Sequence, residues 1–290
     1  MRPAFVARHL VDAPWAEALL QRLGEAEASQ FRRLSAPDLT SVFEEVMGSP
    51  VGGPVHRRFG VSSPSAFWLY YTAAWCTLFE ELQLPSTGAL LEAAAGDTTY
   101  VPEALAVYGG GAGRYVTANL NRDLTQSFLA QTKALTLDVR VVEDNADQIP
   151  RYFPPGTFAL VAFQHAVNDL IQTIVADRHG IDTVSNSWWS VLPSMVRLVM
   201  DYHADGRLET IAAPALIAVL RSVCDVTVDG GYLVFNHCVF QMDLDAGYSQ
   251  ELYGSLIPLA RRWVQESDLP LQIVERDWLD SQWWMVAQKT

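Results

Sequence analysis

The chain divides into two parts by the spacing of its apolar residues. From residue 1 to about residue 85, apolar positions recur at helical spacing with almost no strand-like alternation. Beyond Pro85–Gly88, short apolar runs alternate with helical stretches, which predicts a parallel sheet. We therefore expect a helical N-terminal region over residues 1–85. An α/β domain should follow over residues 86–290, with a helical insertion at about 178–210.

The first part contains an unusual aromatic segment that begins at Ser63. Its apolar residues surround the predicted helix nearly completely, so the helix is either buried or lines a pocket. Tyr70 and Tyr71 lie on this helix. Core packing is the simpler interpretation for both, and the alternative is a lid over a ligand. Two further helices are predicted here, over 14–23 and from about Ser35.

Seven short apolar runs in the second part predict strands. They lie at 89–91, 115–118, 139–142, 158–163, 230–235, 271–276 and 283–287. Helices are predicted from about 101 and at 124–134, 166–177, 191–202, 212–223 and 253–266. Only six residues separate the last two strands, which is too short for a crossover helix. This pair should therefore be antiparallel.

Composition narrows the class of protein. The chain has 290 residues, half of them hydrophobic, and its 33 acidic and 20 basic residues give a formal charge of −13. This charge disfavours nucleic acid and anionic membranes as partners. The three cysteines lie far apart, so neither a disulfide framework nor a metal site is expected. The sequence has no apolar run long enough to span a bilayer, and we expect a cytoplasmic protein.

The segment after the first predicted strand has the character of a nucleotide-binding loop. Glu92 follows the strand, and small residues including Gly96 come after it. Small side chains let a ligand approach the backbone, and the acid can accept a ribose hydroxyl. A nicotinamide-binding fold is the runner-up. The loop lacks that fold's G-x-G-x-x-G motif, and such a fold leaves the terminal hairpin unexplained.

The order of elements, the acid after the first strand and the terminal hairpin resemble the class I S-adenosylmethionine-dependent methyltransferases, over roughly residues 85–290. The resemblance implies a Rossmann-like, seven-stranded, mostly parallel sheet with an antiparallel terminal hairpin. It also implies S-adenosylmethionine as the cofactor, over the carboxyl ends of the first strands. The family's first motif has an acid followed by glycines at every second position. Glu92 and Gly96 match this motif, and Ala94 and Thr98 replace the other two glycines.

Two further family motifs match in part. Asn119 occupies the place of the acid that holds the ribose at the end of the second strand, and Asn121 falls where a small polar residue starts the next helix. The alternative is that both are only turn and cap residues. After the third strand, Asn145 takes the place of the acid that meets the adenine amino group, with Asp144 beside it.

A candidate cofactor-binding residue, Gln164, and the candidate catalytic residues follow the fourth and fifth strands. Gln164 and His165 stand where the sulfonium and the substrate meet in the family, and His237 should lie at the same edge of the sheet. The two histidines are candidate bases because imidazole titrates near neutral pH. Asp169, four residues after His165, can orient its ring. The alternative is that the histidines are capping or core residues.

The insertion begins with paired tryptophans, Trp188 and Trp189. Together with the aromatic helix they can enclose an apolar or aromatic substrate, or they can pack the helical region onto the sheet. The remaining histidines considered, His56, His179 and His203, are interpreted as surface residues.

Two hypotheses for function remain. The first is S-adenosylmethionine-dependent methyl transfer to O, N or C of a small apolar or aromatic molecule. The second is a methyltransferase fold that has lost methyl transfer, as a non-methylating enzyme or a binding or regulatory partner. Thr98, Asn119 and Asn145 depart from the family motifs and favour the second hypothesis. Glu92 and Gly96 match the first motif and favour the first hypothesis, which we prefer. The sequence does not identify the methyl acceptor, and it leaves assembly as a homodimer open.

Overall fold

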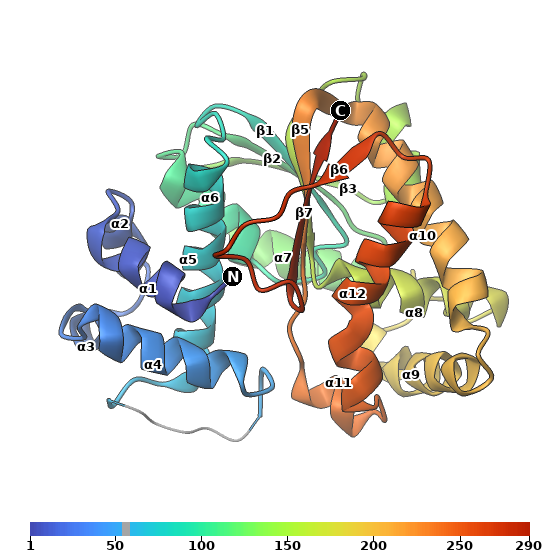
Figure 1. Ribbon diagram of the computed structural model, residues 1–290, viewed down its shortest axis with the longest axis horizontal. Coiled ribbons are helices and arrows are strands. Elements are labelled where there is room, and N and C mark those ends of the chain that lie inside the picture. Colours follow the sequence, from blue (N-terminus) through green and yellow to red (C-terminus); the bar gives the residue numbers. More distant parts are fainter. Residues whose placement is uncertain (54–58) are drawn as a thin grey trace.

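The computed structural model describes residues 1–53 and 59–290, so His56 lies outside the described residues. Seven strands form one sheet, in the order β3-β2-β1-β4-β5-β7-β6 (Figure 1). They are β1 (Ala89–Ala93), β2 (Arg114–Ala118), β3 (Asp138–Val142), β4 (Phe158–Gln164), β5 (Thr227–Asn236), β6 (Leu271–Ile273) and β7 (Trp284–Lys289). β7 is antiparallel to both β5 and β6, and the other pairs are parallel. The predicted mostly parallel sheet and terminal hairpin are confirmed.

The central strands are covered on both faces, which explains their continuous apolar runs. β1 extends two residues beyond the predicted strand, to Ala93. Glu92 is therefore part of the sheet, in register with Thr117 of β2 and Ala162 of β4. Its position inside a strand, rather than in the loop, determines which way its side chain points.

One face of the sheet is covered by helices from the second half of the chain (Figure 1). These are η1 (Ala146–Arg151), α8 (Ala166–Arg178), α9 (Trp188–Ala204), α10 (Leu208–Val226) and α12 (Gln250–Glu266). α9 lies within the predicted insertion. A short helix, α11 (Gln241–Asp245), follows β5. Among the described residues, no helix is both long enough and apolar enough to cross a bilayer.

The other face is covered by α5 (Ser63–Glu81), α6 (Tyr100–Tyr108) and α7 (Arg122–Thr132). Figure 1 shows α1 (Pro3–Asp12), α2 (Ala16–Leu20), α3 (Glu25–Arg32) and α4 (Ala36–Met47) on the outer side of α5. α1 and α3 were not predicted from the sequence. The residues before β1 share a single hydrophobic cluster with this face of the sheet, so the N-terminal region packs as a layer of the sheet domain.

The aromatic helix α5 forms the centre of that layer. Trp75 is fully buried and meets Trp284 of β7 edge-on, with ring centroids 5.3 Å apart. Tyr70 is also fully buried and donates a hydrogen bond to the carbonyl of Met1 at 2.6 Å, while Tyr71 packs against Tyr100. The structure thus agrees with the core-packing interpretation of this helix.

Candidate functional site

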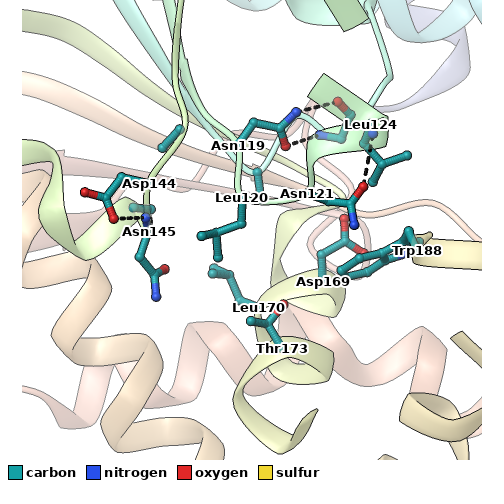
Figure 2. A pocket seen from close by; sticks show the side chains of 14 residues that line it. Asn119, Leu120, Asn121, Leu124, Asp144, Asn145, Asp169, Leu170, Thr173 and Trp188 are labelled. Atoms are coloured by element: carbon teal, nitrogen blue, oxygen red, sulfur yellow. Dashed lines mark hydrogen bonds between the residues drawn. The ribbon is translucent and has the colours of Figure 1, made fainter. Parts of the chain in front are cut away.

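Two adjoining cavities lie at the carboxyl edge of the central strands. The first has a volume of about 480 Å³, and the second about 520 Å³. Gly96, Leu124, Asp169 and Trp188 line both cavities and form a common wall. Figure 2 shows the first cavity, with Asp169 and Trp188 on one side and Asn145 on the other.

The loop after β1 forms one end of both cavities and adopts an unusual backbone. Ala94 has φ 53° and Gly96 has φ 59°, both in the left-handed region. Glycine adopts this region freely, whereas for alanine it is strained by about 1–2 kcal/mol. The Ala94 N–H donates to the carbonyl of Ala118 at 2.9 Å, which holds the loop against β2. Two of the small residues predicted for a ligand-binding loop, Ala94 and Gly96, therefore take a left-handed conformation that favours glycine.

Asn119 at the end of β2 is bonded to this loop rather than presented freely to the cavity. Its Oδ1 accepts the Gly96 N–H at 3.2 Å, and its Nδ2 donates to the Gly96 carbonyl at 2.8 Å (Figure 2). The side chain is 3 % exposed and lines the first cavity. One Oδ1 lone pair and one Nδ2 hydrogen remain for a ligand.

Asn121 begins α7 and also fixes the start of the insertion. Its Oδ1 caps the helix by accepting the Leu124 N–H at 3.0 Å. Its Nδ2 donates to the carbonyls of Thr183 at 2.8 Å and Asn186 at 2.9 Å. Asn121 is therefore a helix cap, and because it also lines the first cavity its predicted contact with the cofactor stays a prediction. The two bonds to the segment before Trp188 were not foreseen, because they join residues more than 60 positions apart.

Replacing Asn121 by Ala is expected to lower the free energy of unfolding by about 2–3 kcal/mol, because a helix cap and two further buried hydrogen bonds are lost. Urea titration measures this change. The matched control is Ser249→Ala, because Ser249 caps α12 through one hydrogen bond to the Leu252 N–H and should cost only about 1 kcal/mol. Equal losses in the two variants would show that the bonds to the insertion contribute nothing.

Asp144 and Asn145 lie at the far end of the first cavity from the common wall. Asp144 accepts hydrogen bonds from the Asn145 N–H at 2.8 Å and the Tyr152 hydroxyl at 2.7 Å. The Tyr152 bond, followed by the bond from Asn145, lowers the pKa of the Asp144 carboxyl. Asp144 is thus held as a carboxylate and positions the backbone of Asn145, whose side chain also lines the cavity. The predicted contact of this pair with adenine stays a prediction.

Glu92 lines neither cavity, which corrects its predicted role as a direct ligand. Its carboxyl is fully buried within the sheet, where the Tyr115 hydroxyl donates to one oxygen while the other has no partner among the described residues. Burial raises the pKa of Glu92 to about 8, against a smaller opposing effect of the Tyr115 bond. Because β1 extends to Ala93, Glu92 shares a face with Leu90 and points to the layer of α5 and α6.

Asp169 occupies the common wall of the two cavities. Its side chain is 24 % exposed, and Asn168 Nδ2 donates to its Oδ1 at 3.2 Å. Desolvation, followed by the charge of Asp243, raises its pKa to about 8. Asp243 lines the second cavity, and burial likewise raises its pKa. Two carboxyl groups therefore face a partly dry space, and the described lining residues place neither lysine nor arginine beside them.

His165 lies at the end of β4 and lines the second cavity, as the sequence predicted. It is the N-cap residue of α8 and has φ 60°, a second non-glycine residue in the left-handed region at this edge of the sheet. Its Nε2 lies 3.2 Å from both Asn168 Nδ2 and the Tyr253 hydroxyl, but 4.0 Å from Asp169 Oδ1. The last distance exceeds a hydrogen bond, so Asp169 does not orient the ring as expected.

The electrostatic environment of His165 disfavours a role as a general base, and that role stays a prediction from the sequence. The side chain is 7 % exposed, and burial lowers its pKa to about 3. A ring with so low a pKa is neutral at physiological pH and takes up a proton only reluctantly. His165 can still accept a hydrogen bond from a neighbouring group in its neutral form.

His237 stacks on His165 with ring centroids 4.6 Å apart, which confirms that the two lie at the same edge of the sheet. It is 1 % exposed, and neither ring nitrogen has a partner among the described residues. Burial, followed by the charge of His165, lowers its pKa. His237 lines neither cavity, so the structure places it behind His165 instead of beside a reacting group.

The remaining predicted residues divide between cavity and core. Thr98, Gln164, Trp188 and Trp189 line the second cavity, and Trp189 is 48 % exposed at its rim. Tyr70 and Tyr71 line neither cavity and belong to the core under the sheet, which corrects the lid interpretation. Within the described residues, no cluster of three or more His, Cys, Asp or Glu side chains suits a metal ion.

Sequence reasoning missed the residues that line the second cavity from beyond β5. Phe240, Met242 and Asp243 lie there, and Tyr253 of α12 holds Asp243 through a 2.7 Å hydrogen bond to Oδ2. The only signal in the sequence was their position after the fifth strand. Residues that follow parallel strands gather at one edge of the sheet.

The strand order, with β7 antiparallel between β5 and β6, defines the Rossmann-like fold of the class I methyltransferases. No protein-family model matches the chain, and no curated protein matches it. A solved structure of an S-adenosylmethionine-dependent methyltransferase from Aquifex aeolicus is similar over 73 % of this chain and 86 % of its own, with 13 % identity and a TM-score of 0.40. An rRNA methylase from Streptococcus thermophilus is similar over 75 % and 95 %, with 10 % identity and a TM-score of 0.40.

Proposed function

We propose that this protein transfers a methyl group from S-adenosylmethionine to a small molecule. One observation carries the proposal: two adjoining cavities at the carboxyl edge of this sheet share a wall that contains Gly96 and Asp169. In open α/β sheets, ligands bind at this edge. A donor in the first cavity and an acceptor in the second would meet at the shared wall, which is the proximity that group transfer requires.

The lining of the first cavity fits the chemistry of the cofactor. The left-handed loop at Ala94 and Gly96 would lie against the methionine portion, and the free hydrogen-bonding capacity of Asn119 would face the ribose. The Asn145 amide would accept from the adenine amino group. Burial raises the pKa of Asp169 to about 8, and a positive charge bound at the wall between the cavities would favour its ionised form. When bound, the cofactor supplies an electrophilic methyl carbon on a sulfonium.

The second cavity supports a small, largely apolar acceptor. Trp188, Trp189, Phe240 and Met242 provide apolar walls, and the acidic groups at the site repel polyanions. A small molecule is therefore favoured over nucleic acid. Neutral His165 contributes a hydrogen-bonding ring at the base of this cavity. A cytoplasmic location and a homodimeric assembly stay predictions from the sequence.

Calorimetric titration tests the proposal. We expect S-adenosylmethionine to bind and Asp169→Asn to weaken its affinity about tenfold, which corresponds to ~1.4 kcal/mol. S-adenosylhomocysteine, which lacks the sulfonium charge, should lose much less affinity in the same variant. The control is Asp201→Asn on the exposed surface of α9, which should bind both ligands as the wild type does. Absence of heat with both ligands in the wild type would refute the proposal.

A second candidate function is binding of the cofactor without methyl transfer. The hydrogen bonds between Asn119 and Gly96 favour it, because they occupy much of the side chain that holds the ribose in the family. The two functions separate in a turnover assay with radiolabelled methyl donor and a panel of small amines, alcohols and phenols. Methylated product from any acceptor excludes the binding-only function.

A further inference from the structure

We propose that the second cavity binds a protonated amine carried on an apolar or aromatic body, and that this nitrogen is the methyl acceptor. The inference rests on the proposed function, because it names the substrate class for the same site. Its evidence is the charge of the cavity, the shape of its walls and an unpaired buried amide.

The charged groups of the second cavity are all acidic. Asp97, Asp169 and Asp243 line it, and its described lining residues include neither lysine nor arginine. His165, the remaining titratable side chain in the wall, stays neutral because of its burial. Burial raises the pKa values of Asp169 and Asp243, and a bound cation would favour their ionised forms, whereas a negatively charged ligand would find no cationic partner among the described lining residues.

These carboxyl groups are held in place without a cationic partner. Asp243 is 5 % exposed and accepts hydrogen bonds from the Tyr253 hydroxyl at 2.7 Å and from Gln172 Nε2 at 3.4 Å. For Asp169, the nearest imidazole nitrogen is 4.0 Å away, on neutral His165. Burying a carboxylate without a counter-charge is unfavourable, and a bound ammonium group would remove that penalty.

Gln164 gives an independent sign of a ligand at this cavity. It lines the cavity and is 2 % exposed. The Trp75 indole N–H, which can only donate, bonds to Gln164 Oε1 at 2.7 Å and so fixes the orientation of the amide. Gln164 Nε2 is left without a partner among the described residues. Such a donor calls for an acceptor, so the amine should also carry an uncharged oxygen, such as a hydroxyl.

The apolar walls match the body of such a ligand. Trp188 and Phe240 line the cavity, and Trp189 and Met242 lie at its rim with 48 % and 42 % of their surfaces exposed. Aromatic faces attract ammonium groups as well as aromatic rings. The same walls therefore suit both the charged and the apolar parts of an arylalkylamine.

The carboxyl groups also serve the chemistry. A protonated amine is not nucleophilic, so the ammonium first passes a proton to the carboxylate of Asp169 or Asp243. The nitrogen lone pair then forms the C–N bond while the S–CH3 bond of the donor breaks, with the electron pair of that bond left on sulfur. The methylated product carries the positive charge, the thioether is neutral, and the carboxyl group later returns its proton to solvent.

Calorimetry with three matched probes tests the proposal on the full-length protein. Tyramine carries the ammonium and a phenolic oxygen, tyrosol replaces the ammonium by a hydroxyl, and 4-hydroxyphenylacetate replaces it by a carboxylate. We expect tyramine to bind about tenfold more tightly than tyrosol, and 4-hydroxyphenylacetate to give no binding heat. Equal affinities for tyramine and tyrosol, or no binding by any of the three, would overturn the proposal.

Variants of the carboxyl groups test which residues produce the preference for tyramine over tyrosol. The Asp169→Asn/Asp243→Asn double variant should bind tyramine and tyrosol equally, whereas the surface control Asp201→Asn should keep the tenfold preference. Survival of the preference in the double variant also overturns the proposal. If the double variant loses its cooperative thermal transition, Asp97→Asn replaces it, with an expected reduction of the preference of about threefold. If Asp97→Asn keeps the full tenfold preference for tyramine, the proposal is overturned.

Separate titration with S-adenosylmethionine distinguishes the two proposals. Cofactor binding without a tyramine preference refutes the amine inference and leaves the proposed function standing. A tyramine preference without cofactor binding refutes the proposed function and leaves an amine-binding cavity.

Discussion

Replacing Glu92 by Gln is expected to make the protein more stable than the wild type at pH 8 and to change its stability little near pH 4. Glu92 is fully buried, and burial raises its pKa from 4.5 to about 8. At pH 8 and above, the folded wild type must therefore carry a buried carboxylate. The glutamine side chain of the variant cannot ionise, and its carbonyl can still accept the hydrogen bond that Tyr115 donates to Glu92.

The direction of the pH dependence follows from the two pKa values. In the unfolded chain Glu92 loses its proton near pH 4.5, whereas in the folded protein it keeps the proton until about pH 8. Between these values folding takes up a proton, so the stability of the wild type falls as the pH rises. The difference in the free energy of unfolding between the wild type and Glu92→Gln should change by up to about 1.4 kcal/mol per pH unit in this window.

Urea unfolding at pH 4, 5, 6, 7 and 8 measures the effect. Glu143→Gln is the matched control, because Glu143 is exposed and no hydrogen bond of its side chain is described. That variant should follow the wild type at every pH. If Glu92→Gln does so too, the buried carboxyl is already ionised at low pH and our account of its environment is wrong.

Replacing Asn119 by Leu is expected to reduce the affinity for S-adenosylmethionine by about 10- to 100-fold. The change removes both hydrogen bonds that hold the Gly96 backbone against β2. Two lost bonds and an unpaired backbone amide amount to ~2–4 kcal/mol, some of it in stability and some in binding. Without these bonds, fewer interactions hold the loop in the conformation that strains Ala94.

A conservative variant distinguishes the effect of Asn119 on the loop from its predicted contact with the ribose. Asn119→Asp keeps the acceptor for the Gly96 N–H and loses only the donor to its carbonyl, so affinity should fall less than tenfold. Calorimetry on both variants, with thermal unfolding as a check on folding, gives the comparison. Wild-type affinity in Asn119→Leu would show that the loop holds its conformation without this side chain.

The strands were predictable from the sequence because each carries a short, continuous apolar run. Burial of the sheet on both faces produces such runs, and all seven predicted strands occur. The helices α1 and α3 were missed, since they are short and α3 is largely polar on its exposed surface. Their buried residues join the hydrophobic cluster that also contains α5, and no local pattern reveals such long-range packing.

Apart from Asp169, Trp188 and Trp189, the predicted residues that line the cavities lie within a few positions of the end of a strand. The positions of Gly96, Asn119, Asn145 and His165 along the chain place them at the edge of the sheet, and each lines a cavity. The orientation of Glu92 was not foreseen, because the predicted strand ended one residue before it. The low pKa of His165 and the role of Asp243 depend on burial by α11 and α12, which lie far along the chain.

The contacts of Asn121 have a consequence for movements of the start of α9. Its two bonds hold the segment just before Trp188, and Trp188 lines both cavities. The start of α9 cannot swing outward to widen either entrance unless those bonds break. One side chain after β2 therefore holds a segment next to a wall that both cavities share, so an outward movement of the start of α9 would alter both cavities at once.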